Sequence, residues 1–95
     1  MQVYTLPDIS PNGTAVALFA ALPYQAVWVT IAAPSTNSAD ARYGDSNVSS
    51  SRGATIPKGT SQTLFRADYQ QQGYDLSRTY VWASGSDKLT ITYGQ

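Results

Sequence analysis

The chain has 95 residues, no cysteine and no histidine, and its six basic and six acidic residues give a formal net charge of zero. This length fits one domain, and the composition excludes disulfides and imidazole catalysis. Nucleic acid is disfavoured as a main partner, because phosphate binding needs clustered Lys or Arg. Only 13% of the residues are charged, about half the usual share, so we expect a surface rich in hydroxyl and amide groups. Such a surface suits contact with other proteins, and it equally fits an ordinary hydroxyl-rich β domain.

Residues 1–12 are expected to form either an extended N-terminal arm or an edge strand. Val3, Tyr4 and Leu6 are apolar, but the run is short and is soon followed by proline. Pro-Asn-Gly at positions 11–13 predicts a turn, because Asn and Gly adopt positive φ at low cost.

Two apolar runs follow this turn. The alanines of Thr14–Leu22 favour a helix, whereas its position between turns and beside strand-like runs favours a strand, which is our prediction. Ala26–Ala32 is the clearest strand, because the β-branched residues Val29 and Ile31 alternate with other residues. Trp28 lies on the opposite face of this strand.

The rest of the chain is predicted to contain further short strands separated by polar, Gly-containing or Pro-containing loops. They are Ala39–Tyr43, Ala54–Ile56, Ser61–Arg66, Thr79–Ala83 and Lys88–Tyr93. The last two are joined by residues 84–87, a Gly-containing connection of hairpin length. Seven or eight short strands without a convincing helix predict a single all-β domain over residues 1–95, either a small antiparallel β-sandwich or a jelly-roll-like barrel. No apolar run is long enough for a membrane-spanning helix, so no membrane partner is expected.

Catalytic and metal-binding residue patterns are missing from the sequence. Without histidine, a carboxylate pair would have to use Asp, and Asp40 with Asp45 or Asp68 with Asp75 are the pairs nearest to a predicted strand or polar segment. Aspartates in such positions usually cap turns or face solvent. No Asp-x-Asp spacing of a calcium loop occurs. We therefore predict no enzyme activity, no cofactor and no metal.

Several stretches occur in a distinctive order: a strand, a Gly-Asp-Ser turn, a Pro-x-Gly turn, an Asp-Leu turn, a Gly-x-Asp hairpin and a final strand. These stretches are Val29–Asn37, Arg42–Ser49, Gly53–Ser61, Tyr74–Ser77 and Tyr80–Tyr93. Taken together they resemble a small virion domain that recurs in tailed bacteriophages.

The resemblance implies a small β-sandwich that is a structural part of a phage particle and not an enzyme. In that family the expected role is a head decoration (cement) protein on the capsid exterior. Its partners would be the major capsid protein and copies of itself, with a trimer as one closed arrangement. The alternatives are a tail, baseplate or fibre module, or a carbohydrate-binding module whose sugar-binding face would use Trp28, Tyr80 and Trp82.

The contact with the particle is expected to use apolar residues that lie outside the core stripe. They are Val3, Tyr4, Leu6 and Ile9 from the first residues of the chain, together with Trp28. Trp28 has an alternative role in a second core layer of the domain itself.

Overall fold

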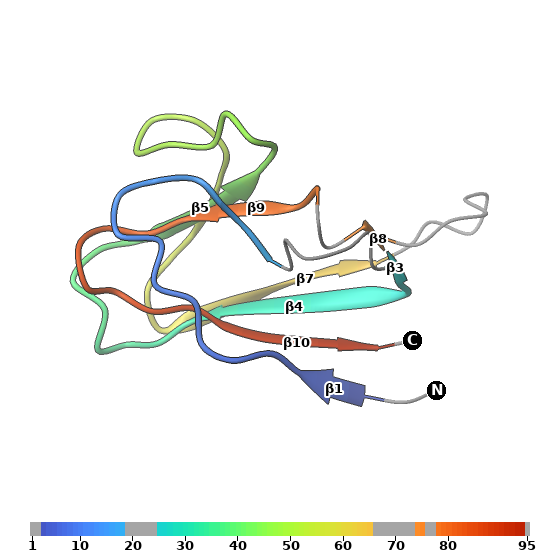
Figure 1. Cartoon of the computed structure of the whole chain (residues 1–95). Coiled ribbons are helices and arrows are strands. Elements are labelled where there is room, and N and C mark those ends of the chain that lie inside the picture. Colours follow the sequence, from blue (N-terminus) through green and yellow to red (C-terminus); the bar gives the residue numbers. More distant parts are fainter. Residues whose placement is uncertain (1–2, 19–24, 66–73, 76–77, 95) are drawn as a thin grey trace.

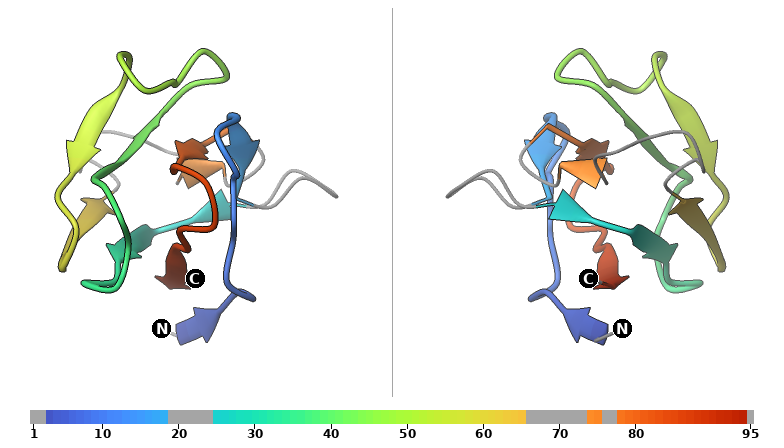
Figure 2. Two further views of the ribbon diagram at one scale, coloured as in Figure 1. Left: turned by 90° about the vertical axis from the view of Figure 1, so that its left-hand side faces the viewer. Right: turned by 90° about the vertical axis from the view of Figure 1, so that its right-hand side faces the viewer.

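All regular structure in the computed structural model, which describes residues 3–18, 25–65, 74–75 and 78–94, is β-structure. Two four-stranded antiparallel sheets form two layers (Figures 1 and 2). The first sheet contains, in spatial order, β1 (Val3–Thr5), β10 (Thr90–Gly94), β4 (Trp28–Ala33) and β7 (Thr60–Phe65). The second contains β2 (Val16–Ala17), β9 (Tyr80–Trp82), β5 (Ala41–Gly44) and β6 (Ala54–Ile56). A separate pair joins β3 (Gln25–Ala26) to β8 (Tyr74–Asp75).

The chain winds between the two sheets. It passes from the first sheet to the second between β1 and β2, between β4 and β5, and between β7 and β9. It returns to the first sheet between β2 and β4, between β6 and β7, and between β9 and β10. The resulting spatial order is that of the jelly roll, a double-sheet fold of eight strands and two Greek keys. The prediction of an all-β antiparallel sandwich is therefore confirmed.

The predicted hairpin between the last two strands is wrong. Although β9 and β10 are separated by few residues, β9 pairs with β2 and β5, and β10 pairs with β1 and β4. Residues 84–87 therefore connect the two layers. Val81 on β9 and Ile91 on β10 are both fully buried, because they reach the same core from opposite sides.

The strand predicted over Ala26–Ala32 is interrupted at Val27. Ala26 belongs to β3, whereas β4 begins at Trp28, and the Val27 amide donates a 2.8 Å hydrogen bond to the Gly94 carbonyl. The alternation predicted for β4 is confirmed, since Val29 and Ile31 have no exposed surface.

The strand predicted for Thr14–Leu22 is present as β2, which covers two residues, and positions 19–22 lie outside the described residues. The predicted turn at 11–13 is confirmed. The Thr14 amide donates a 3.2 Å hydrogen bond to the Pro11 carbonyl. Asn12 and Gly13 have φ values of 53° and 78°, and two consecutive positive φ values are the reason that Asn-Gly suits this position.

The core lies between the sheets and is built from the alternate residues of each strand. Its buried members are Leu18, Ala26, Val29, Ile31, Ala33, Ala41, Ile56, Val81, Ala83, Leu89, Ile91 and Tyr93. They come from both sheets, because each sheet buries its apolar face by packing against the other. Within the described residues, no helix has the length and apolar character needed to cross a membrane.

A clasp formed by Asn37 and Asp87 ties two connections together at one end of the sandwich. Both side chains are buried, with 6% of their surface exposed. The Asn37 amide donates to the Lys88 carbonyl at 2.9 Å and its oxygen accepts from the Lys88 amide at 3.0 Å. The Asp87 carboxylate accepts from the Ser38 amide at 2.8 Å and the Ser38 hydroxyl at 3.0 Å. A third hydrogen bond comes from the Ala39 amide at 3.2 Å. All three hydrogen bonds to Asp87 are donated to its carboxylate and stabilise the ionised form.

Asp87 is expected to make folding stability depend on pH. The hydrogen bond from the Ser38 backbone is the main reason that the pKa of Asp87 lies below its ordinary value. Because the pKa of Asp87 is lower in the folded than in the unfolded state, the carboxylate contributes fully to the free energy of unfolding at pH values above the unfolded-state pKa. This contribution is lost as the pH falls through the folded-state pKa. Thermal unfolding of the native chain and of Asp87→Asn should therefore differ most near neutral pH and converge in acid. A difference that stays constant across this range would contradict the assignment.

Candidate functional site

Among the described residues, the side chains that project outward from the strands of the first sheet are all uncharged. Residues paired across an antiparallel sheet project to the same side, so the register places two rows on this face, one across four strands and one across three. One row is Thr5, Thr92, Thr30 and Thr63, and the next is Thr90, Ala32 and Ser61. Val3, Gly94 and Trp28 form a third row at the end where the two termini lie (Figure 1). We call this surface the threonine face and define it by these residues.

The threonine face is accessible and hydroxyl-rich. Val3 is 59% exposed and is the large hydrophobic side chain with the greatest exposure among the described residues, while Trp28 is half-buried. The Thr30 and Thr63 hydroxyls lie 2.8 Å apart and share a hydrogen bond, and the Thr90 hydroxyl donates to Asp8 at the margin of the face, at 3.4 Å. The β-branched threonines have restricted χ1 rotamers, so few positions are open to each hydroxyl.

The structure separates the five residues that the sequence proposed for the interface. Val3 and Trp28 lie on the threonine face. Tyr4, Leu6 and Ile9 point to the other side and pack against the core, where the Tyr4 ring stacks on Tyr93 with centroids 5.2 Å apart.

Residues 3–9 are held along the edge of the first sheet. The strand β1 pairs with β10, the Leu6 amide donates to the Ile91 carbonyl at 3.0 Å, and Ile9 forms a two-way bridge with Leu89. Of the two arrangements considered for residues 1–12, an edge strand is present at Val3–Thr5, and Ile9 adds an isolated bridge to the same edge. Removing them would therefore disturb the sheet itself, so point substitutions are the appropriate probes of this surface.

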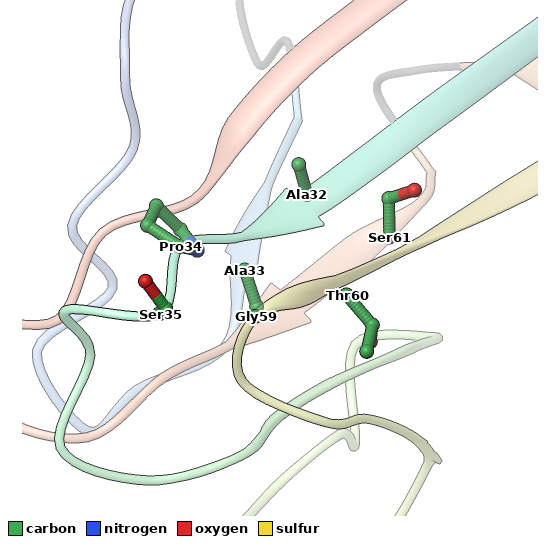
Figure 3. Close-up of a pocket in the computed structure, with 7 residues that line it drawn as sticks. All are labelled: Ala32, Ala33, Pro34, Ser35, Gly59, Thr60 and Ser61. Carbon is green, nitrogen blue, oxygen red and sulfur yellow. The ribbon is translucent and has the colours of Figure 1, made fainter.

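A depression of about 330 Å³ lies where the threonine face meets the ends of β4 and β7 (Figure 3). In Figure 3 the side chains of Ala32 and Ser61 project to the same side from these neighbouring strands. The depression is lined by Ala32, Ala33, Pro34, Ser35, Gly59, Thr60 and Ser61. These side chains are small and uncharged, so the depression extends the chemistry of the threonine face and offers no group for acid–base catalysis.

Unlike the threonine face, the outer face of the second sheet carries a charged side chain and is partly covered by a loop. Arg42 projects there opposite Trp82, and its guanidinium donates to the Gly53 carbonyl at 2.9 Å. The loop after β5 folds back over this face, because a Cβ built on Gly44 would lie 3.8 Å from the Cβ of Val48. The buried Val48 thus fills a small apolar site outside the main core.

The proposed sugar-binding face of three aromatic residues is wrong as a single surface. Trp28 lies outside the first sheet, whereas Tyr80 and Trp82 alternate with the buried Val81 and therefore lie outside the second. The two groups are on opposite sides of the sandwich. Tyr80 and Trp82 remain neighbours on one face.

Asp40 and Asp45, the pair named from the sequence, accept hydrogen bonds from backbone amides. The Asp45 carboxylate accepts from the Asn47 amide at 2.9 Å, and the Asp40 carboxylate accepts from the Lys58 amide at 3.0 Å. Asp68 and the side chain of Asp75 are not in the part of the chain that the structure describes. In the part of the chain that the structure describes, no three His, Cys, Asp or Glu side chains gather as metal ligands.

The selection of interface residues from the sequence used hydrophobicity and did not include the threonines of this face. The alternation of Thr90 and Thr92 with Ile91 was a sufficient signal that they share an outer face, but their neighbours across the sheet follow only from the register. Comparisons with protein-family models, with curated proteins and with solved structures find no match to this chain.

Proposed function

We propose that this chain is a structural protein of a tailed-bacteriophage particle, a head decoration protein that binds the outer capsid surface and stabilises it. The order of turns from Val29 to Tyr93 supports this proposal through its resemblance to virion domains. The double-sheet jelly roll supports it by analogy, since this fold occurs in viral capsid proteins as well as in lectins.

The observation that carries the proposal is the threonine face. It is uncharged, accessible and built on four hydrogen-bonded strands, so a partner can contact it without desolvating a charge. Hydroxyl groups on such a face can exchange water for hydrogen bonds to main-chain groups of the capsid. Each contact is modest, but a particle that presents many equivalent sites gains stability from all of them, and a symmetric cluster of bound copies strengthens each one's attachment by avidity.

The proposal is tested first by counting copies in purified particles of the phage that encodes the chain. Quantitative mass spectrometry should find hundreds of copies, as expected for a protein that covers the head. A handful of copies would favour the tail, baseplate or fibre alternative, and no copies would remove the virion proposal.

Charged substitutions on the threonine face test where the particle binds. Val3→Lys and Thr92→Lys should each weaken binding to particles lacking the protein at least tenfold, because the lysine must be desolvated in the contact. Thr55→Lys is the matched control, since Thr55 is an exposed threonine on the outer row of the second sheet. Equal binding by all three variants in a sedimentation assay would show that the face is not the contact.

A carbohydrate-binding role is favoured by one observation only, the neighbouring Tyr80 and Trp82 on the second sheet. Aromatic rings beside a polar group can stack on a sugar. A glycan array probed with the native chain and with Trp82→Ala would support this alternative if binding depended on Trp82. Binding to no glycan would remove it.

A further inference from the structure

Each sheet of the sandwich ends in two edge strands, and these four edges are not equivalent. In the first sheet the edges are β1 and β7, and in the second they are β2 and β6. Three of them have two or three residues, whereas β7 has six. Proline and charged residues usually protect an open edge from pairing with another chain, and the sequence of β7, Thr-Ser-Gln-Thr-Leu-Phe, contains neither.

The hydrogen-bond pattern shows which main-chain groups of β7 face outward. The Ile91 carbonyl accepts from Leu6 on the β1 side, and the Gly94 carbonyl accepts from Val27 on the β4 side. Main-chain groups of successive strand residues point to opposite edges, so Trp28, Thr30 and Ala32 bond toward β10. Val29, Ile31 and Ala33 bond toward β7, as the 2.6 Å hydrogen bond from the Gly59 amide to the Ala33 carbonyl indicates.

Residues 62 and 64 of β7 therefore bond to β4, while the Thr60 amide at the start of the strand donates to the Pro57 carbonyl at 3.1 Å. The amides and carbonyls of Ser61, Thr63 and Phe65 point the other way, to an edge with which no described strand pairs. Unpaired groups of this kind form a template for an additional strand.

We propose that β7 pairs with the β7 strand of a second copy of this chain, antiparallel and about a two-fold axis at Thr63. In this register Thr63 lies opposite Thr63 of the partner copy, and Ser61 lies opposite Phe65. The outward groups then form about six main-chain hydrogen bonds, two for each hydrogen-bonded pair. The closed symmetry of such a contact is two-fold, not the three-fold considered from the sequence.

The second copy is the occupant that the edge fits, for two reasons. An antiparallel strand is complementary to itself under two-fold rotation, and six uncharged residues bring no like charges together. The register also continues the threonine row, because Thr30 pairs with Thr63 within one copy and Thr63 meets Thr63 between copies. Cross-strand Thr–Thr pairs are favourable, so the threonine face becomes one surface across eight strands. This self-association does not depend on the particle.

A charge-pair exchange at Thr63 tests the register by analytical ultracentrifugation. The native chain should show a concentration-dependent monomer–dimer equilibrium. Thr63→Lys and Thr63→Glu should each weaken self-association at least tenfold, because two like charges would lie directly opposite. An equimolar mixture of the two should recover a dimer. The same pair of substitutions at Thr55 on β6 is the control and should leave the equilibrium unchanged.

Amide exchange of the native chain gives a second, independent readout. The amides of Gln62 and Leu64 should be protected at every concentration, whereas those of Ser61 and Thr63 should become protected only as the dimer forms. A chain that stays monomeric at millimolar concentration would overturn the proposal. So would a dimer that ignores the Thr63 substitutions, or one whose Ser61 and Thr63 amides exchange as in the monomer.

Discussion

Gly53→Ala is expected to lower the free energy of unfolding by roughly 2–5 kcal/mol, the combined cost of backbone strain and overpacking. Gly53 has a φ of +108°, which L-residues with a side chain rarely adopt. A Cβ at this position would lie 2.6 Å from Cγ2 of Val48 and 2.7 Å from the Tyr43 carbonyl oxygen. The carbonyl belongs to the sheet and cannot move aside cheaply, so the loop must be displaced.

The displaced loop would carry Val48 away from its buried site, since Gly44 and Gly53 lie on either side of that side chain. Loops of this kind, with neighbouring ends and an apolar side chain packed beneath, keep their shape through their own contacts. The polar residues between Asp45 and Arg52 are therefore presented in a defined conformation, which the substitution would remove.

Urea unfolding of the native chain and of Gly53→Ala measures this effect. Gly85→Ala is the matched control, because Gly85 also has a positive φ, +52°, but has no atom within 4 Å of the added Cβ. Its expected cost is only about 1 kcal/mol, the penalty of a left-handed conformation alone. Equal losses for the two variants would show that the close approach at Gly53 contributes nothing.

Asn37→Ala should destabilise the protein by roughly 2–4 kcal/mol, since it removes two hydrogen bonds and leaves both main-chain groups of Lys88 without that partner. The Asn37 amide imitates a strand neighbour, donating to the Lys88 carbonyl and accepting from the Lys88 amide. With Asp87 it forms the clasp that holds the β4–β5 connection against the β9–β10 connection.

The effect is measured by the midpoint of thermal unfolding, with Asn47→Ala as the control. Asn47 is exposed, and its main-chain amide, not its side chain, bonds to Asp45. The control should change stability by less than about 0.5 kcal/mol, as is usual for an exposed site. A loss for Asn37→Ala no larger than this would mean that solvent replaces the clasp without cost.

The interface residues chosen from the sequence show where pattern reasoning is insufficient. Hydrophobicity selected Tyr4, Leu6 and Ile9 for the interface, but these three side chains are half-buried and pack against the core. The threonines were not selected, because the sequence of one strand does not reveal which residues lie beside it in the neighbouring strands. Only the pairing of β1, β10, β4 and β7 aligns four of them in one row.

The amino-acid sequence by itself determined the all-β class, the turn at Asn12-Gly13 and the buried stripes of β4 and β10. These features depend on local alternation and backbone preference, which neighbouring residues decide. The tertiary structure alone decided that β9 and β10 belong to different sheets, that Asn37 and Asp87 close one end of the sandwich, and that the described side chains on the outer face of the first sheet are uncharged. These features join residues far apart in the chain, and their free energy comes from burial and hydrogen bonds that exist only after both layers have assembled.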